Sequence, residues 1–452
     1  MRCLAWIIAG ASLLVSACGP DSEPPTEAGT AAVAPRAPLP LEPALGALLP
    51  AGHTSFDNDS LAGLFAIMSH EVEGGARRPH LVRYEALVTV TPEGAIPGLE
   101  AFLDGYLAQL RAEAGVPTSR GVGGNLLIRF ADGPRFARAV PGAACAIAAG
   151  DVTWQAFSHD PEAASGGSIS ALERIDRMTI FVPDDALPYR VRNCLLEEIP
   201  QALGLSSDLF GLGMSSFNDD GAHIWPTKLD YLMLRLLYAP EIETGLDRRE
   251  TRARANALLD RINPQGRNAP RLPRLRTSGL GEWSDSMAKV FSRRTSGRAR
   301  IKSIDKALTL IQANAPGSAQ HCHTLVTAGR VLSRPDPARA VAMLDQARTI
   351  CETAHGPQDV RLARIGLEKA CALLRLARYN EAISLAEATW PIFAAYRQDE
   401  RLAALYTIEA DALAATEPGS ERAARTAERA RAWNAYAVGP GRRASNCRPS
   451  TG

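Results

Sequence analysis

The sequence predicts an α+β domain followed by an all-α array of helical repeats. Between residues 55 and 262, short apolar or β-branched runs alternate with amphipathic helical segments, which is typical of a mixed α/β domain. Between residues 301 and 436, alanine and leucine recur at helical spacing and show an internal period. A basic, proline-containing segment at 263–300 separates these parts and is predicted to be a loose linker.

The expected elements of the first domain follow a simple order. The predicted helices and strands are a helix over 60–70, a strand over 82–90, a helix over 99–114, and strands over 125–130 and 178–182. The turn residues Pro92-Glu93-Gly94 are expected to stop the first strand. A further helix should follow the last strand, so that a buried strand leads directly into the segment described next.

The segment Arg192–Asp208, RNCLLEEIPQALGLSSD, has the spacing of a zinc-peptidase helix that has lost its histidines. In the usual motif, two histidines one helical turn apart bind the metal, and the glutamate between them activates a water molecule. A glycine then ends the helix and allows a third ligand to follow. Here Glu197 stands at the first ligand position, Glu198 at the base and Gln201 at the second ligand position. Gly204 stands at the turn, and Ser207 or Asp208 at the third ligand position.

The residues at these positions do not provide the nitrogen ligands that the zinc motif requires. Glu197 and Gln201 share a helix face, but neutral glutamine is a weak donor and zinc prefers nitrogen and sulfur. Oxygen ligands from Glu197, Gln201 and Asp208 would suit a divalent cation such as calcium or magnesium better. Glu198 could act as a general base only beside a metal-bound water. We therefore expect no cofactor, with a bound divalent cation as the alternative.

Two further observations bear on this site. Pro200 lies inside the predicted helix, where it removes a hydrogen bond and is expected to bend the chain and displace Gln201. His223 and His159 are the histidines nearest to the motif, and either could add one nitrogen ligand from a loop. Isolated loop histidines are more often solvated than metal-bound, and that is the expectation for both.

The first domain resembles a bacterial family of unknown function, number 2927, over roughly residues 60–245. The residues that carry the resemblance are CLLEEIPQALGL at 194–205, SSFNDD at 215–220 and LDYLMLRLLY at 229–238. The order of elements is similar to that of zincins, with Met214–Asn218 in place of the turn below the metal site and Pro226–Tyr238 in place of the last helix. The family has no established activity, so the resemblance implies a degenerate zincin-like fold and no reaction.

The second domain repeats small residues at a fixed distance. Ala340, Ala382 and Ala424 are forty-two residues apart, and Ala328, Ala370 and Ala412 have the same spacing. The segment LLRLARYNEAISLAEA at 373–388 resembles a tetratricopeptide repeat, which implies stacked helix pairs and protein binding. A plain helical bundle is the alternative. The tail at 437–452 is expected to be disordered.

The N-terminus predicts export and a lipid anchor. Residues 1–18 contain a positive residue, a short apolar core and the lipobox-like VSAC, which places acylation at Cys18. An ordinary signal peptide is the alternative. Gly19 favours the outer over the inner membrane in the commonest sorting scheme, and the Pro/Ala-rich segment 19–54 should be an extended tether.

The remaining cysteines fit an oxidising compartment such as the periplasm. We expect the pairs Cys145–Cys194 and Cys322–Cys351, with buried free thiols as the alternative. The formal net charge is +1, from 50 basic and 49 acidic residues, which does not favour a nucleic-acid partner.

Together these features predict a lipid-anchored envelope protein whose function is binding and not catalysis. The degenerate cleft would hold a peptide or a protein, and the array would recruit another protein. One alternative is a metal-dependent peptidase or hydrolase with an oxygen-ligand site. Another is a structural envelope scaffold.

Overall fold

The computed structural model describes residues 56–447, except for gaps at 73–75, 95, 97, 141–142, 165–168, 208, 210–211, 213, 218–221, 272–280, 292–294, 358 and 445–446. All described residues belong to one compact unit. The predicted signal peptide, the acylated Cys18 and the tether lie outside the described residues. Within the described chain, no helix has both the length and the apolar character needed to cross a membrane.

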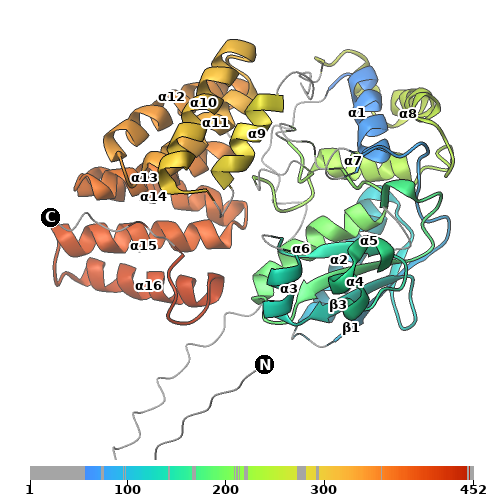
Figure 1. The fold of residues 1–452 in the computed structure, drawn as a ribbon, viewed down its shortest axis with the longest axis horizontal. Coiled ribbons are helices and arrows are strands. Elements are labelled where there is room, and N and C mark those ends of the chain that lie inside the picture. The colour runs from blue at the N-terminus through green and yellow to red at the C-terminus, as the bar shows by residue number, and fades with distance from the viewer. Residues whose placement is uncertain are drawn as a thin grey trace, which may run out of the picture. The chain divides into compact units, whose positions relative to one another are not determined.

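A five-stranded sheet forms the centre of the first domain (Figure 1). The strand order is β2-β1-β3-β5-β4, and all neighbours are parallel except the edge strand β4, which is antiparallel to β5. The strands are β1 Val88–Glu93, β2 Thr118–Arg120, β3 Leu126–Ala131, β4 Ala146–Ala149 and β5 Met178–Pro183. The two later predicted strands are thus confirmed as β3 and β5.

The strand predicted over 82–90 is wrong at both ends. It begins only at Val88, because the preceding residues form an anchored loop in which Arg83 donates a hydrogen bond to the carbonyl of Leu237, 2.7 Å away. It continues through Pro92, which pairs with Ile128 of β3. Proline is tolerated there because β2 pairs only with residues 88–90, so the other edge of β1 is open at that point.

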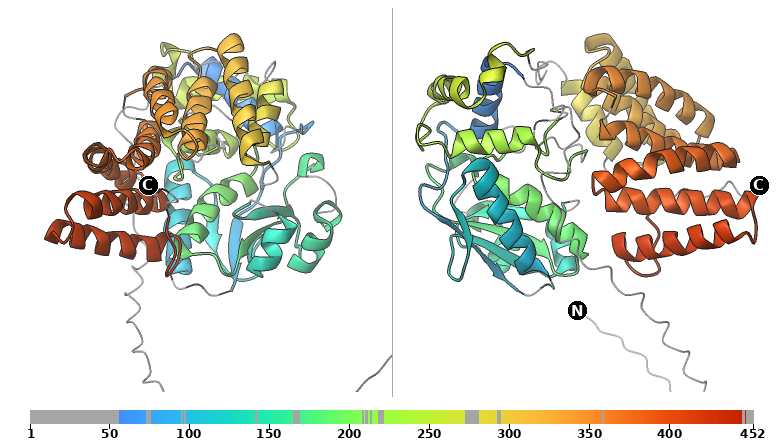
Figure 2. Two further views of the ribbon diagram at one scale, coloured as in Figure 1. Left: turned by 60° about the vertical axis from the view of Figure 1, so that its left-hand side comes forward. Right: turned by 180° about the vertical axis from the view of Figure 1, so that it is seen from behind.

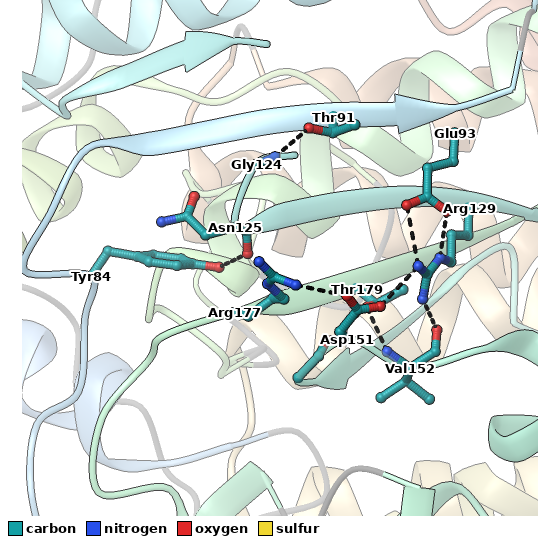
Figure 3. A network of polar contacts seen from close by, with 11 residues as sticks. Tyr84, Thr91, Glu93, Gly124, Asn125, Arg129, Asp151, Val152, Arg177 and Thr179 are labelled. Atoms are coloured by element: carbon teal, nitrogen blue, oxygen red, sulfur yellow. Dashed lines mark hydrogen bonds and ion pairs between the residues drawn. The ribbon is translucent and has the colours of Figure 1, made fainter. Parts of the chain in front are cut away.

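Glycines allow the chain to cross β1 on its way from β2 to β3, which lie on opposite sides of that strand. A Cβ atom on Gly124 would lie 2.0 Å from the carbonyl oxygen of Thr89, so only glycine fits. The hydroxyl of Thr91 holds this crossing in place, since it donates to the carbonyl of Gly121. It also accepts a hydrogen bond from the amide of Gly124, which Figure 3 shows.

A polar network holds neighbouring strands together on one side of the sheet (Figure 3). Arg129 of β3 forms ion pairs with Glu93 of β1 at 2.7 Å and with Asp151, just after β4, at 2.8 Å. Asp151 is shared with Arg177, at 2.7 Å. Because the charges alternate across the strands, each carboxylate contacts a guanidinium, and the pKa of Asp151 is lowered below its usual value even though partial burial opposes this shift.

Helices cover both faces of the sheet. One face packs against α2 and α6 in the main core, with Tyr106, Ile180 and Ile199 among its buried side chains. The other face carries a smaller aromatic cluster in which the rings of Trp154 and Phe181 are 5.4 Å apart. The helices of this domain are α1 Asn58–His70, α2 Leu99–Ala114, α3 Gly133–Ala139, α4 Trp154–His159, α5 Pro161–Ala164, α6 Pro188–Ala202, α7 Lys228–Leu237 and α8 Arg248–Ile262.

The segment expected to be a loose linker contains a helix, α9 Gly281–Phe291. Its side chains Trp283, Met287 and Val290 are buried against Ile304 of the next helix. These residues are three or four positions apart, so the helix has an apolar stripe that overrides the basic composition around it. The helical part of the chain therefore begins before residue 301.

The second domain is an array of paired helices (Figure 2). The helices are α10 Gly297–Asn314, α11 Ala319–Leu332, α12 Pro337–His355, α13 Val360–Arg375, α14 Tyr379–Ala395, α15 Asp399–Thr416 and α16 Glu421–Ala437. Each helix packs on its successor, and α13 also packs on α11 and α15. The structure thus supports a helical repeat-like array.

The repeated alanines lie where these helices pack together. The alanines at 328, 340, 370, 382 and 412 are all fully buried, with no exposed surface. Ala424 of α16 is exposed, since no later helix of the described chain packs on that face. Five of the six positions therefore have the close-packing role that the spacing predicted.

Three disulfides link the described cysteines. Cys145–Cys194 and Cys322–Cys351 are the two pairings expected from the sequence, and Cys371–Cys447 is a third that was not anticipated. The third disulfide ties the C-terminal segment to α13, and Arg443 adds an ion pair with Asp411 of α15. The tail predicted to be disordered is therefore held in place at residues 438–444 and at Cys447.

Candidate functional site

Helix α6 carries the motif residues and follows β5 after a short turn. Pro188 occupies its first turn, where a missing amide costs nothing. The helix ends just before Gly204, which has a φ of +127°. A Cβ atom at this position would lie 2.5 Å from the carbonyl oxygen of Val82, so the predicted glycine turn is required by the packing.

Pro200 does not break α6. The helix continues to Ala202, so Gln201 remains in helical geometry. Pro200 has no amide to donate to the carbonyl of Leu196, one turn earlier, and the hydroxyl of Tyr106 on α2 donates to that carbonyl instead, at 3.3 Å. The helix is therefore not interrupted at Pro200, because a side chain distant in sequence satisfies the acceptor that proline leaves unpaired.

The motif residues have different environments. Glu197 is exposed, whereas Glu198 is only 8% exposed and Gln201 only 4%. Ser207 is also buried, at 3% exposure, and Asp208 lies outside the described residues. The position of the general base and that of the second ligand are thus closed to solvent, while the position of the first ligand is open.

The two candidate loop histidines also differ. His159 is exposed at the end of α4, as expected for a solvated loop residue. His223 is buried, at 8% exposure, and its ring centroid lies 5.8 Å from that of Tyr396 in the array. The expectation that His223 is solvated is therefore wrong. Among the described residues, no group of three or more His, Cys, Asp and Glu side chains is arranged to hold a metal ion.

The turn at Ser215 and Ser216 is fixed by a buried carboxylate on α7. Asp230 is fully buried and accepts hydrogen bonds from the hydroxyl of Ser215, from the amide and hydroxyl of Ser216 at 2.9 Å each, and from the amide of Thr227 at 2.7 Å. Burial raises the pKa of Asp230, and these donors oppose that shift. Asp230 and Thr227 also form a capping box at the start of α7.

Arg78 holds the segment that follows α6 in place. Its side chain is buried, at 3% exposure, and donates to the carbonyl of Gly204 at 3.3 Å and to the hydroxyl of Ser206 at 3.0 Å. It also donates to the carbonyl of Ile169. Burial lowers the pKa of Arg78 to about 10.

The array contacts α6 and the segment after the turn. Arg192 of α6 forms a buried ion pair with Asp399 of α15 at 2.8 Å. Gln398, just before α15, donates to the carbonyl of Ala222 at 2.6 Å. Tyr189, near the start of α6, donates to Glu400 at 2.9 Å. The motif helix is thus packed between its own sheet and the first turn of an array helix.

Arg78, Asp230 and the contact with the array were not predicted from the sequence. Nothing in the local sequence distinguishes a buried arginine from a solvated one, and two of the three acceptors of Arg78 lie more than a hundred residues away along the chain. Asp230 did carry a usable signal, because Thr227 and Asp230 have the spacing of a capping box ahead of an apolar run.

Comparison with known families covers the part of the chain that contains these features. Residues 58–257 match the family described as "Protein of unknown function (DUF2927)". The match includes the sheet, α6, the turn and α7, and it ends inside α8. No curated protein and no solved structure matches the chain.

Proposed function

We propose that this chain is a non-catalytic binding protein of the bacterial cell envelope. In this proposal, a degenerate zincin-like domain supports a protein-binding, tetratricopeptide-like array, and acylation of Cys18 anchors the protein to a membrane that faces the periplasm. Three features support the zincin-like assignment: the antiparallel edge strand β4, the passage from β5 into α6, and the glycine turn at Gly204.

The burial of the motif carries the non-catalytic part of this proposal. A general base and its metal ligands must be reached by water and substrate during turnover. Here the base position, Glu198, and the second ligand position, Gln201, are both less than a tenth exposed. The neighbouring segment, at Ala222, is also hydrogen-bonded to Gln398 of the array. These residues have the environment of a structural core.

One observation favours the alternative, a metal-dependent hydrolase with an atypical site. His223 is buried and comes from the segment after the turn, where an imidazole could supply one nitrogen ligand. In that case Glu198 would be the base and Glu197 and Asp208 would provide oxygen ligands. The two functions differ in whether the protein cleaves peptides and whether cleavage depends on Glu198.

A hydrolysis assay separates the two functions. Purified full-length protein, prepared without chelator, is incubated with casein and with a mixed peptide library, alone and with zinc, calcium or magnesium. We expect no new peptide termini by mass spectrometry in any condition. Cleavage by the wild type that is lost in Glu198→Gln and kept in the matched surface variant Glu352→Gln would establish the hydrolase instead.

A further inference from the structure

Three aromatic rings from three successive helices lie next to one another at the end of the array. The ring of Trp390 on α14 is 5.9 Å from that of Tyr406 on α15, and the ring of Trp433 on α16 is 6.3 Å from Tyr406. Tyr406 is buried, at 5% exposure, whereas both tryptophans keep part of their surface exposed. Tyr406 is thus the inner ring, and the tryptophans are the outer ones.

One helical turn away, the same three helices carry charged residues. Glu387 is three residues before Trp390, and Glu409 is three residues after Tyr406, so each carboxylate shares a helix face with an aromatic ring. Arg422 of α16 forms an ion pair with Glu387 of α14 at 2.9 Å. Because short connections make neighbouring helices antiparallel, Glu387, Glu409 and Arg422 lie at one level of the array.

Glu409 is the buried acid of this level. Its side chain is only 5% exposed, and its Oε2 atom accepts no hydrogen bond in the part of the chain that the structure describes. Arg422 is already paired with Glu387 and with Glu417, at 2.9 Å each. A buried carboxylate without a donor is unfavourable, so a cation supplied from outside the chain would be stabilised here.

Arg429 of α16 shows that the aromatic level accepts a cation. Its guanidinium lies over the ring of Tyr406, 5.2 Å from the centroid. Arg429 is exposed, and within the described chain it forms no ion pair with Glu409. An aromatic face that attracts cations is therefore next to a carboxylate that lacks one. The cluster discussed below consists of Trp390, Tyr406, Glu409, Arg429 and Trp433.

We infer that this cluster binds the ammonium group of a lysine side chain on a partner protein. The lysine would displace the exposed Arg429 from the ring of Tyr406 and pair with the carboxylate of Glu409. Its apolar stem would lie against the two tryptophans. The inference rests on the proposed binding function of the array and names the group that the partner presents.

The charges around the cluster favour a cation over an anion. Arg422 is balanced by its two carboxylate partners, Glu387 and Glu417. With Glu409 included, the carboxylates of this region outnumber the guanidinium groups of Arg422 and Arg429 by one. A lysine ammonium is a compact charge on a flexible stem, so it can enter between rings where a planar guanidinium would need paired acceptors.

Tryptophan fluorescence and ligand-observed NMR with the full-length protein test the inference. The probe is the capped peptide Gly-Ser-Lys-Ser-Gly, and matched peptides carry norleucine, arginine or glutamate in place of lysine. Titrations up to about 10 mM cover the weak affinity that a single side chain provides. We expect the lysine peptide to bind about fivefold more tightly than the norleucine peptide, which keeps the apolar stem and lacks the charge.

Two variants should change this affinity in opposite directions. Glu409→Gln removes the carboxylate charge and should weaken binding of the lysine peptide about fivefold or more. Arg429→Ala removes the competing cation and should strengthen binding about twofold or more, which a misfolded protein would not do.

A matched variant and the pH dependence provide the controls. Arg431→Ala makes the same change at an exposed position of α16, two residues from Arg429 and therefore on another helix face, and should leave the affinity unchanged. Burial raises the pKa of Glu409, so the affinity of the wild type should fall as the pH is lowered. Glu409→Gln should remove this dependence.

The remaining outcomes would overturn the inference. Equal binding of the lysine and norleucine peptides would do so, as would weaker binding in Arg429→Ala or equal effects of Glu409→Gln and Arg431→Ala. Preference for the arginine or glutamate peptide would keep a binding function for the array and refute the lysine partner. If no peptide binds, the inference is wrong, whereas the non-catalytic proposal is decided separately by the hydrolysis assay.

Discussion

The buried ion pair between Arg192 and Asp399 should stabilise the described unit as a whole. Its side chains are only 2% and 6% exposed and lie 2.8 Å apart. The guanidinium of Arg192 also lies over the ring of Trp225, 5.4 Å from the centroid. Removing one partner of a buried pair leaves the other charge without compensation, and this typically costs about 3–5 kcal/mol.

The two single variants should lower the free energy of unfolding by different amounts. Asp399→Asn leaves the Arg192 cation buried, and we expect it to lower the free energy of unfolding by about 3 kcal/mol. Arg192→Met keeps apolar contact with Trp225 and leaves Asp399 in the first turn of α15, where a helix N-terminus stabilises an anion by up to about 1–2 kcal/mol. That variant should therefore lose less, about 2 kcal/mol.

Urea unfolding, followed by tryptophan fluorescence and by circular dichroism, provides the assay. The double variant Arg192→Met/Asp399→Leu should lose about 3 kcal/mol or less, well below the sum of the single losses, since neither charge is left buried alone. Single losses below about 0.5 kcal/mol that simply add in the double variant would refute a buried, coupled pair.

Three further predictions concern the first domain. Tyr106→Phe should lower the free energy of unfolding by about 1–3 kcal/mol because the carbonyl of Leu196 loses its donor, and adding Pro200→Ala should restore most of this in the same urea assay. Burial lowers the pKa of His70, so its contribution to stability is complete above pH ~6.5 and is lost as pH falls below that value. In His70→Gln, the slope of unfolding free energy against pH below 6.5 should be shallower by up to about 1.4 kcal/mol per pH unit, and an unchanged slope would contradict the assignment. Gly204→Ala should cost roughly 2–4 kcal/mol or prevent folding, since the backbone at φ +127° and the carbonyl of Val82 leave no room for a Cβ; thermal melts within 1 °C of the wild type would count against this.

Local patterns in the sequence predicted much of the architecture. The helices at 58–70 and 99–114 have apolar residues at helical spacing, and the strands at 126–131 and 178–183 are short apolar runs ended by turn residues. The alanine spacing in the array was informative because alanine allows helices to approach closely, and five of those alanines are fully buried. Gly204 was predictable because a helix that must turn sharply requires a residue that tolerates positive φ.

The parts that sequence analysis missed depend on contacts between distant residues. The helix at 281–291 looked like linker because its arginine-rich surroundings concealed the spacing of Trp283, Met287 and Val290. Pro200 looked disruptive because the compensating donor, Tyr106, lies ninety residues before Leu196, whose carbonyl accepts the hydrogen bond. The local sequence does not indicate which arginine will be buried beside a carboxylate, as Arg192 is beside Asp399.

Elemental analysis of the full-length protein, purified without chelator, tests the central claim most directly. We expect zinc and other transition metals to be far below one equivalent per chain, and any calcium or magnesium to be removed by gel filtration. We also expect Glu197→Ala and Asp208→Ala to leave the metal content unchanged. A stoichiometric metal ion that survives gel filtration and is lost in these variants would contradict a non-catalytic motif.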